Sequence, residues 1–145
     1  MEKKKTTGDL LDIIKKGSSF SETQKEIGNE QLNGTLSQHL NELVAQRGAV
    51  LADIMKRSGL KKAYFYSLFD GSRDNPSRDV LIQLGFGFEM TLDEMQEFLK
   101  RHGAAQLYPR IPRDGVIIYA LHRRMTVVEC DILLADNEEA LLSRI

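Results

Sequence analysis

The chain has little cysteine and no long apolar segment. Only Cys130 among its 145 residues is a cysteine, which excludes an internal disulfide and a cysteine-rich zinc site. No apolar run approaches the roughly 20 residues that a membrane-spanning helix needs. The N-terminus begins with lysines, but the acidic residues Asp9 and Asp12 come soon after them, so a secretory signal is not expected there. These absences predict a cytoplasmic protein with no membrane partner.

Catalytic motifs are also missing. His39, His102 and His122 are isolated, and none has the paired spacing of a zinc-binding helix. His102 precedes a glycine, so we expect it to end a helix, where an imidazolium interacts favourably with the helix dipole. Cys130 lies in an apolar stretch that predicts a buried side chain. The sequence therefore predicts a protein that is not an enzyme and has no metal or cofactor.

The net charge is only −1, but the charges are unevenly distributed. Residues 35–74 carry six basic and four acidic side chains, whereas residues 75–106 carry three basic and five acidic ones. The basic excess is small and is typical of a solvated surface. It nevertheless lies in the part of the chain where the local pattern predicts contact with phosphates.

That pattern is in residues 52–71, where two short apolar-periodic stretches flank a glycine. Gly59 falls where the first helix must stop and the backbone needs a positive φ, which costs glycine least. The spacing of Phe65, Leu68 and Phe69 places these side chains on one face of the second helix. Two helices joined by so short a turn predict a helix-turn-helix, whose second helix can enter the major groove of DNA.

The next part of the chain carries a family resemblance. Residues 72–81 read Ser-Arg-Asp-Asn-Pro-Ser-Arg-Asp-Val-Leu, and residues 84–95 contain Gly-Phe-Gly-Phe-Glu-Met-Thr-Leu. They resemble the link to the fourth helix and the entry to the fifth helix of phage-repressor-like regulators (Cro-type, xenobiotic-response-element family). The resemblance covers about residues 36–103. It implies a five-helix helix-turn-helix domain, which we place at residues 35–106.

The same resemblance implies which residues bind DNA. In this family, the residues just after the turn and along the outer face of the third helix approach the bases. Lys62 would then donate to guanine O6 and N7, and Ala63 would touch a thymine methyl group. Ser67 would bind a base or a phosphate, while residues 72–73 would hold the backbone. The full predicted set is Lys61, Lys62, Ala63, Tyr64, Tyr66, Ser67, Ser72 and Arg73.

The C-terminal half repeats itself at an offset of 35 residues. Residues 78–79 and 113–114 are both Arg-Asp, and residues 90–91 and 125–126 are both Met-Thr. In each copy the Asp is placed to favour a helix N-terminus, and the Thr begins a capping box for a second helix. We therefore predict that residues 107–145 are a C-terminal helical extension that repeats residues 72–107.

The whole pattern predicts an all-α chain: short N-terminal helices, the five-helix domain and an additional helical pair. Residues 1–34 form the N-terminal helical extension, with amphipathic segments at 8–16 and 21–32. Residues 107–112 contain two prolines and should be extended, because Pro disfavours helix at the preceding residue. The other helices are expected at 37–46, 50–57, 62–69, 78–86, 92–102, 113–123, 127–135 and 138–144.

Two functions fit this sequence. The first is a sequence-specific transcriptional regulator that reads double-stranded DNA with the helix at 62–69 and binds as a homodimer through the appended helical pair. The alternative is a non-enzymatic interaction or signalling adaptor, with a protein partner on its N-terminal or C-terminal helices. The near-neutral charge and the run Tyr64-Phe65-Tyr66 favour the alternative, since both tyrosine rings can instead pack against neighbouring helices.

Overall fold

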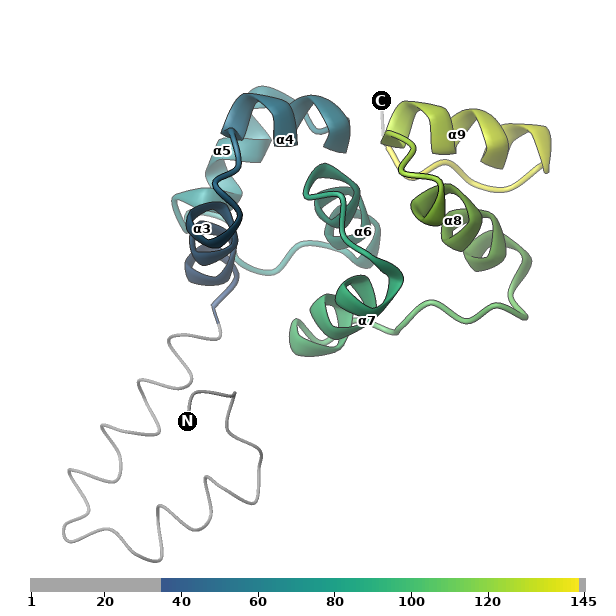
Figure 1. The fold of residues 1–145 in the computed structure, drawn as a ribbon, viewed down its shortest axis with the longest axis horizontal. Helices are drawn as coiled ribbons and strands as arrows, with labels where there is room; N and C mark the ends of the chain where they lie inside the picture. Colours follow the sequence, from purple (N-terminus) through teal and green to yellow (C-terminus); the bar gives the residue numbers. More distant parts are fainter. Residues whose placement is uncertain (1–34, 144–145) are drawn as a thin grey trace, which may run out of the picture.

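The computed structural model describes residues 35–143, which form seven helices and no strand (Figure 1). The described chain is thus all-α, as the sequence predicts. The amphipathic segments predicted at 8–16 and 21–32 lie outside the described residues. The helices are α3 (Leu36–Arg47), α4 (Leu51–Ser58), α5 (Lys62–Phe69), α6 (Arg78–Gly87), α7 (Leu92–Arg101), α8 (Pro112–His122) and α9 (Val127–Asp136).

These helices begin and end within one residue of the predicted positions, because their cap residues act locally. Thr91 Oγ1 accepts a hydrogen bond from the Glu94 N–H at 3.2 Å, and Glu94 Oε1 accepts one from the Thr91 N–H at 2.9 Å. This capping box also lowers the pKa of Glu94, chiefly through the bond from the Thr91 N–H. Thr126 and Glu129 form the same box at 3.2 and 2.8 Å. His102 is the C-cap of α7, as predicted.

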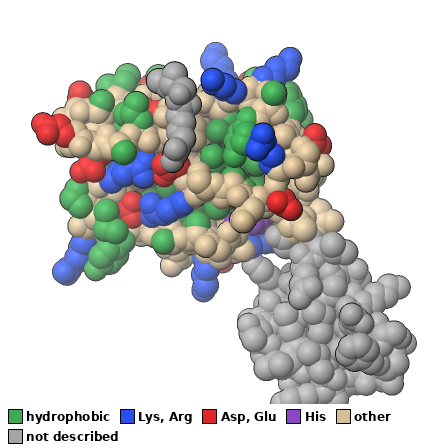
Figure 2. Space-filling view, turned by 180° about the vertical axis from the view of Figure 1, so that it is seen from behind, with side chains coloured by type: hydrophobic (Ala, Val, Ile, Leu, Met, Phe, Trp, Pro, Cys, Tyr) green, Lys and Arg blue, Asp and Glu red, His purple; other side chains and the backbone are tan. Residues whose placement is uncertain are grey.

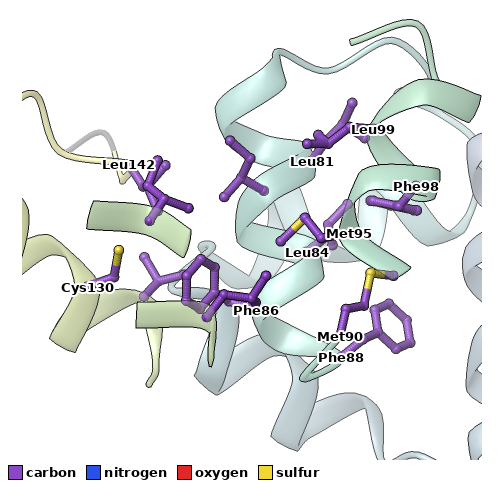
Figure 3. Close-up of a cluster of buried hydrophobic side chains, with 14 of the residues drawn as sticks. Leu81, Leu84, Phe86, Phe88, Met90, Met95, Phe98, Leu99, Cys130 and Leu142 are labelled. Atoms are coloured by element: carbon purple, nitrogen blue, oxygen red, sulfur yellow. The ribbon is translucent and has the colours of Figure 1, made fainter. Parts of the chain in front are cut away.

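Helix α6 is the centre of the core. Every residue from 81 to 88 is buried, so this helix has neighbours on all sides. Gly87 permits the closest of these contacts, since a Cβ there would lie 2.7 Å from the Ile54 carbonyl oxygen of α4. Figure 3 shows the buried side chains continuing from α6 through Phe86 to Cys130 and Leu142. One hydrophobic core therefore extends across residue 107, where the sequence places a boundary.

The two halves of the repeat have the same local structure. We call residues 78–107 the first unit and residues 113–142 the second unit. Glu89 and Arg124, which are 35 positions apart, both take up a left-handed backbone conformation, with φ of 53° and 57°. Leu99 and Leu134 are both fully buried, as the repeat predicts.

Each unit ends in an extended segment that a polar side chain holds in place. The Leu107 N–H donates to Gln96 Oε1 at 2.7 Å, and the Leu142 N–H donates to Asp131 Oδ1 at 2.7 Å. Asp131 also accepts a hydrogen bond from Ser143 Oγ at 2.6 Å. Both leucines are buried, which closes the core of each unit.

The helix predicted at 138–144 is therefore wrong over the described residues 138–143, which are not helical. Glu138 has a φ of 58° and stops α9, as Gly103, with a φ of 76°, stops α7. The Leu142 N–H is bonded to the Asp131 side chain rather than to a carbonyl of a preceding turn. The segment after α9 takes the same course as the segment after α7, where the sequence pattern shows an extended chain.

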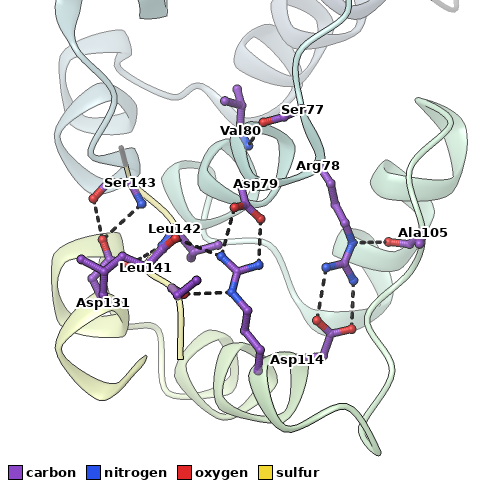
Figure 4. A network of polar contacts seen from close by, with 12 residues as sticks. Ser77, Arg78, Asp79, Val80, Ala105, Asp114, Asp131, Leu141, Leu142 and Ser143 are labelled. Atoms are coloured by element: carbon purple, nitrogen blue, oxygen red, sulfur yellow. Dashed lines mark hydrogen bonds and ion pairs between the residues drawn. The ribbon is translucent and has the colours of Figure 1, made fainter. Parts of the chain in front are cut away.

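Two ion pairs join the units reciprocally (Figure 4). Arg78 donates two hydrogen bonds to the Asp114 carboxylate, at 2.9 and 3.2 Å. Arg113 donates two to the Asp79 carboxylate, both at 3.0 Å, and this raises the pKa of the Arg113 guanidinium above its usual value. Because each Arg binds the Asp of the other unit, the two units face each other across an approximate two-fold axis. Each Arg also donates to two backbone carbonyls of its own unit's extended segment: Ala105 and Gln106 for Arg78, Ala140 and Leu141 for Arg113.

Candidate nucleic-acid interface

The candidate interface is built on the turn between α4 and α5. Gly59 has a φ of 70°, the left-handed conformation that the sequence predicts for it. Ser58 is fully buried, and its hydroxyl donates to the Met55 carbonyl at 2.8 Å and accepts from the Leu60 N–H at 3.2 Å. These bonds satisfy polar groups at the end of α4 and fix the direction in which the chain enters α5.

Helix α5 divides into a buried and an exposed face. Phe65 and Leu68 are fully buried and Phe69 is 8% exposed, which confirms the predicted inner face. Lys61, just before the helix, and Lys62 and Ala63 in its first turn are all exposed. The N-terminus of this helix therefore presents two cations and a methyl group to solvent.

Tyrosines occupy two further positions of the predicted set. Tyr66 is 37% exposed and its ring meets Phe65 edge-on, so it reaches solvent while resting on the core. Tyr64 is half-buried, and the Arg73 guanidinium lies over its ring at 5.2 Å from the centroid, within cation–π range. The contact brings Arg73, which comes after α5 in the chain, back to the surface of α5.

Ser67 and Ser72 are held by neighbouring groups. Ser67 Oγ is half-buried and donates to the Tyr64 carbonyl at 2.6 Å, so this hydroxyl is turned toward the helix backbone. Ser72 donates to Asp70 Oδ1 from both its hydroxyl, at 2.7 Å, and its N–H, at 2.8 Å. These bonds lower the pKa of the Asp70 carboxyl, so an anion is fixed beside Ser72. The sequence prediction did not include Asp70, although an Asp two residues before a Ser in a turn signals this side-chain-to-backbone bond.

The second unit also reaches this surface. A Cβ at Gly59 would lie 3.2 Å from a Val127 methyl carbon, so α9 packs directly behind the turn. A hollow of about 570 Å³ lies beside α5, with Leu60, Tyr64 and Val80 on one side and Leu142 and Ser143 on the other. Figure 2, seen from behind, shows apolar side chains gathered near the middle of this face with Lys and Arg side chains beside them. The contact joins residues about 80 positions apart in the sequence, and no local pattern signals it.

The side chains of His39, His102 and Cys130 make contacts within the fold. His39 Nδ1 and His102 Nε2 lie 2.8 Å apart, between α3 and α7. Cys130 is fully buried, and burial raises the pKa of its thiol to about 12, as fits a small core side chain. Within residues 35–143 no group of histidine, cysteine and acidic side chains is placed to hold a metal ion. None of the helices in this range is both long and apolar enough to cross a bilayer.

The predicted residues thus fall into two groups. Lys61, Lys62, Ala63, Tyr66 and Arg73 share the exposed surface of α5, and Ser72 is exposed after it, bound to Asp70. Tyr64 and Ser67 are partly withdrawn from that surface. A scan of protein-family models finds no match to the chain, and neither curated proteins nor solved structures yield a similar protein.

Proposed function

We propose that this chain is a DNA-binding transcriptional regulator that places α5 in the major groove. One observation carries the proposal: the inner face of α5 is buried, while Lys61, Lys62, Ala63 and Arg73 are presented together outside it. A helix that is fixed on one side and has cations at its N-terminus and beside its outer face has a form that groove reading uses. The likeness to phage-repressor-like regulators supports the proposal, with α3–α7 as the five helices of that domain.

In this proposal each exposed residue has a separate role. Lys62 binds a guanine edge and Ala63 contacts a thymine methyl group, so these two residues contribute specificity. Lys61 and Arg73 neutralise phosphates, and Tyr64 orients Arg73 through the ring contact. Asp70 keeps Ser72 in place and, as an anion, disfavours close approach of phosphate at its own position.

A homodimer is part of the proposal, because a single domain of this size offers limited contact with DNA. The second unit supports it through a difference from the first. Exposed Asp93 and Glu97 of α7 correspond, 35 positions later, to Val128 and Ile132 of α9. The latter are 61% and 58% exposed. The copy thus carries apolar side chains where the first unit meets solvent with acids, as a contact between subunits requires.

The protein-interaction function remains the alternative, and the hollow beside α5 favours it. Leu60, Tyr64 and Val80 give that hollow an apolar lining, and Tyr66 stands exposed nearby on the same helix. A partner side chain fits such a surface as well as a base does.

The experiment that separates the two functions is titration of labelled duplex DNA, using random genomic fragments, with the wild-type chain and a Lys62→Ala/Arg73→Ala variant. Loss of the Arg73 phosphate contact should weaken binding on all sequences and reduce the slope of log K against log salt by about one, and loss of the Lys62 contact to a base should weaken binding further. The matched control is Lys100→Ala/Arg110→Ala, which removes the same charge from exposed positions outside α5. A Lys62/Arg73 variant with the affinity and slope of the control would place the interface elsewhere.

The dimer has its own test. In Val128→Asp/Ile132→Glu, the second unit takes the residues of the first unit at two exposed positions, so the fold should be unaffected. We expect the mass from light scattering to fall from dimer to monomer, with an unchanged thermal melt. A wild-type chain that is monomeric at micromolar concentration would contradict the dimer.

A further inference from the structure

The second unit has an open apolar groove between its two helices. The groove has a volume of about 410 Å³, and Val116 and Tyr119 of α8 and Leu133 of α9 form its apolar lining. Tyr119 is 48% exposed, and Val116 and Leu133 are only half-buried. Nothing in residues 35–143 covers these side chains as completely as a core would.

In the first unit, the side chains at the corresponding positions are covered by the rest of the fold. The counterparts of Val116, Tyr119 and Leu133, 35 residues earlier, are Leu81, Leu84 and Phe98, which are 2%, 0% and 2% exposed. Helix α3 contributes to this cover. Its His39 ring lies 5.5 Å from the Phe98 ring and is hydrogen-bonded to His102, whose counterpart in the groove is Asn137.

The groove is therefore the second copy of a surface that is covered in the first copy, where α3 contributes through His39 at Phe98 and His102. Helix α3 itself is amphipathic and buries Leu36 and Leu40, four residues apart. An occupant of the open groove should have the same chemistry: a short helix with aliphatic side chains at positions i and i+3 or i+4. The α3 of a second copy cannot supply it, since its leucines are 3% and 0% exposed in their own core.

We propose that the occupant is residues 8–16 of the same chain. This segment reads Gly-Asp-Leu-Leu-Asp-Ile-Ile-Lys-Lys and has four aliphatic residues within five positions, at 10, 11, 13 and 14. No other run in residues 1–34 matches this density. Leu10, Ile13 and Ile14 have the i, i+3, i+4 spacing that the groove requires.

The connection to α3 is long enough for this placement. Residues 17–35 reach up to about 60 Å when extended, at about 3.3 Å per residue. A compact domain of about 100 residues has a radius of gyration of about 13 Å, so the far side of the molecule lies within this reach. The first half of the segment also suits the charge at the groove, because Arg123 lies over the Tyr119 ring at 4.5 Å and Asp9 and Asp12 precede Lys15 and Lys16 in the segment.

The test uses the full chain and nuclear magnetic resonance of its methyl groups. A nitroxide is attached at Ser18→Cys, next to the segment, while the buried Cys130 thiol, whose pKa is raised to about 12, stays unreactive at neutral pH. We expect the Val116 and Leu133 methyl signals to broaden, and the Leu68 signals, deep in the core at α5, to stay sharp. Ile13→Asp/Ile14→Asp in the labelled chain should remove the broadening, whereas the control Lys15→Asp/Lys16→Asp should leave most of it.

A mixed sample identifies the source of the segment. Isotope-labelled chains without a nitroxide are combined with nitroxide-labelled chains at natural isotope abundance. Broadening of Val116 and Leu133 in this mixture would show that a second copy supplies the segment, and would overturn the proposal. Methyl signals that stay sharp in both samples would also overturn it. The substitution Tyr119→Glu changes the groove itself. It places a charge at a side chain that is already 48% exposed, so it should abolish the broadening without unfolding the chain.

Discussion

The first and second units are two versions of one structure, and their comparison separates what the fold needs from what the surface adds. The reciprocal Arg–Asp pairs, the Thr–Glu capping boxes, the left-handed residue before the Met-Thr pair and the tethered leucine occur in both. These features act within the backbone of each unit or across the contact between the units. They are the scaffold of the helix pair.

The units differ in what surrounds them. The first unit is covered by α3, α4 and α5, and its helix α6 is buried from residue 81 to 88. The second unit lies at the end of the molecule. It holds four of the eight exposed large hydrophobic side chains in the described residues, and two more, Tyr108 and Ile111, lie in the segment that leads into it. A copied surface that stays apolar without cover indicates a further contact. The shared features therefore stabilise the helix pair, and under the proposals above the differences provide the binding surfaces.

The largest expected effect comes from the matched leucines of the two cores. Leu99→Ala and Leu134→Ala should each lower the free energy of unfolding by about 2–5 kcal/mol, because both side chains are fully buried and leave cavities. Urea unfolding followed by circular dichroism measures both. A Leu134→Ala variant as stable as wild type, beside a strongly destabilised Leu99→Ala, would show that the second unit is not part of the common core.

The second-largest effect should come from the two ion pairs, which we expect to contribute unequally to stability. Asp114 is 2% exposed and Asp79 is 20% exposed, and Asp114 Oδ2 also accepts a hydrogen bond from the Tyr108 N–H at 2.9 Å, so removing Asp114 leaves both Arg78 and this N–H without their partner. We expect Asp114→Ala to cost about 3 kcal/mol, as for a broken buried pair, and Asp79→Ala to cost less. Thermal unfolding of the two variants, with Asp93→Ala as an exposed control, decides between them. Equal losses for Asp79 and Asp114 would mean that burial does not distinguish the two pairs.

A smaller effect tests the contact between the second unit and the turn between α4 and α5. Gly59→Val and Gly48→Val both place a β-branched residue at a positive φ, of 70° and 59°, and each should cost more than about 1 kcal/mol. A Cβ at Gly59 also meets Val127 at 3.2 Å, whereas nothing lies within 4 Å of one at Gly48. Gly59→Val should therefore melt at the lower temperature. If the order is reversed, α9 does not press on the turn.

The sequence predicts local structure well because local rules decide it. Gly59, Thr91, Thr126 and His102 act on the nearest turn of chain, and their helices begin and end as predicted. The helix expected at 138–144 fails where a distant group decides: Asp131 binds the Leu142 N–H and keeps that segment extended. The repeat indicates an extended chain here instead of a helix, because the segment lies 35 residues after one that ends in an extended Leu107.

The candidate interface shows the same division. Periodicity identifies the outer face of α5, because burial of Phe65, Leu68 and Phe69 leaves only the opposite side free. Three further features depend on contacts that spacing does not specify: the placement of Arg73 over Tyr64, the anion at Asp70 and the approach of residues 142–143. The reciprocal pairing of Arg78 with Asp114 is likewise a contact between units, although the repeated Arg-Asp pairs mark the residues involved.

If the outer face of α5 binds DNA, as proposed, binding by the wild-type chain must depend strongly on salt. Fluorescence anisotropy of a labelled random-sequence duplex, titrated at several salt concentrations, gives Kd and the slope of log K against log salt. We expect binding at low salt that weakens steeply, with a slope of about −0.9 for each phosphate neutralised. A chain that shows no binding to DNA at the lowest salt concentration would contradict the claim and favour the protein-interaction function.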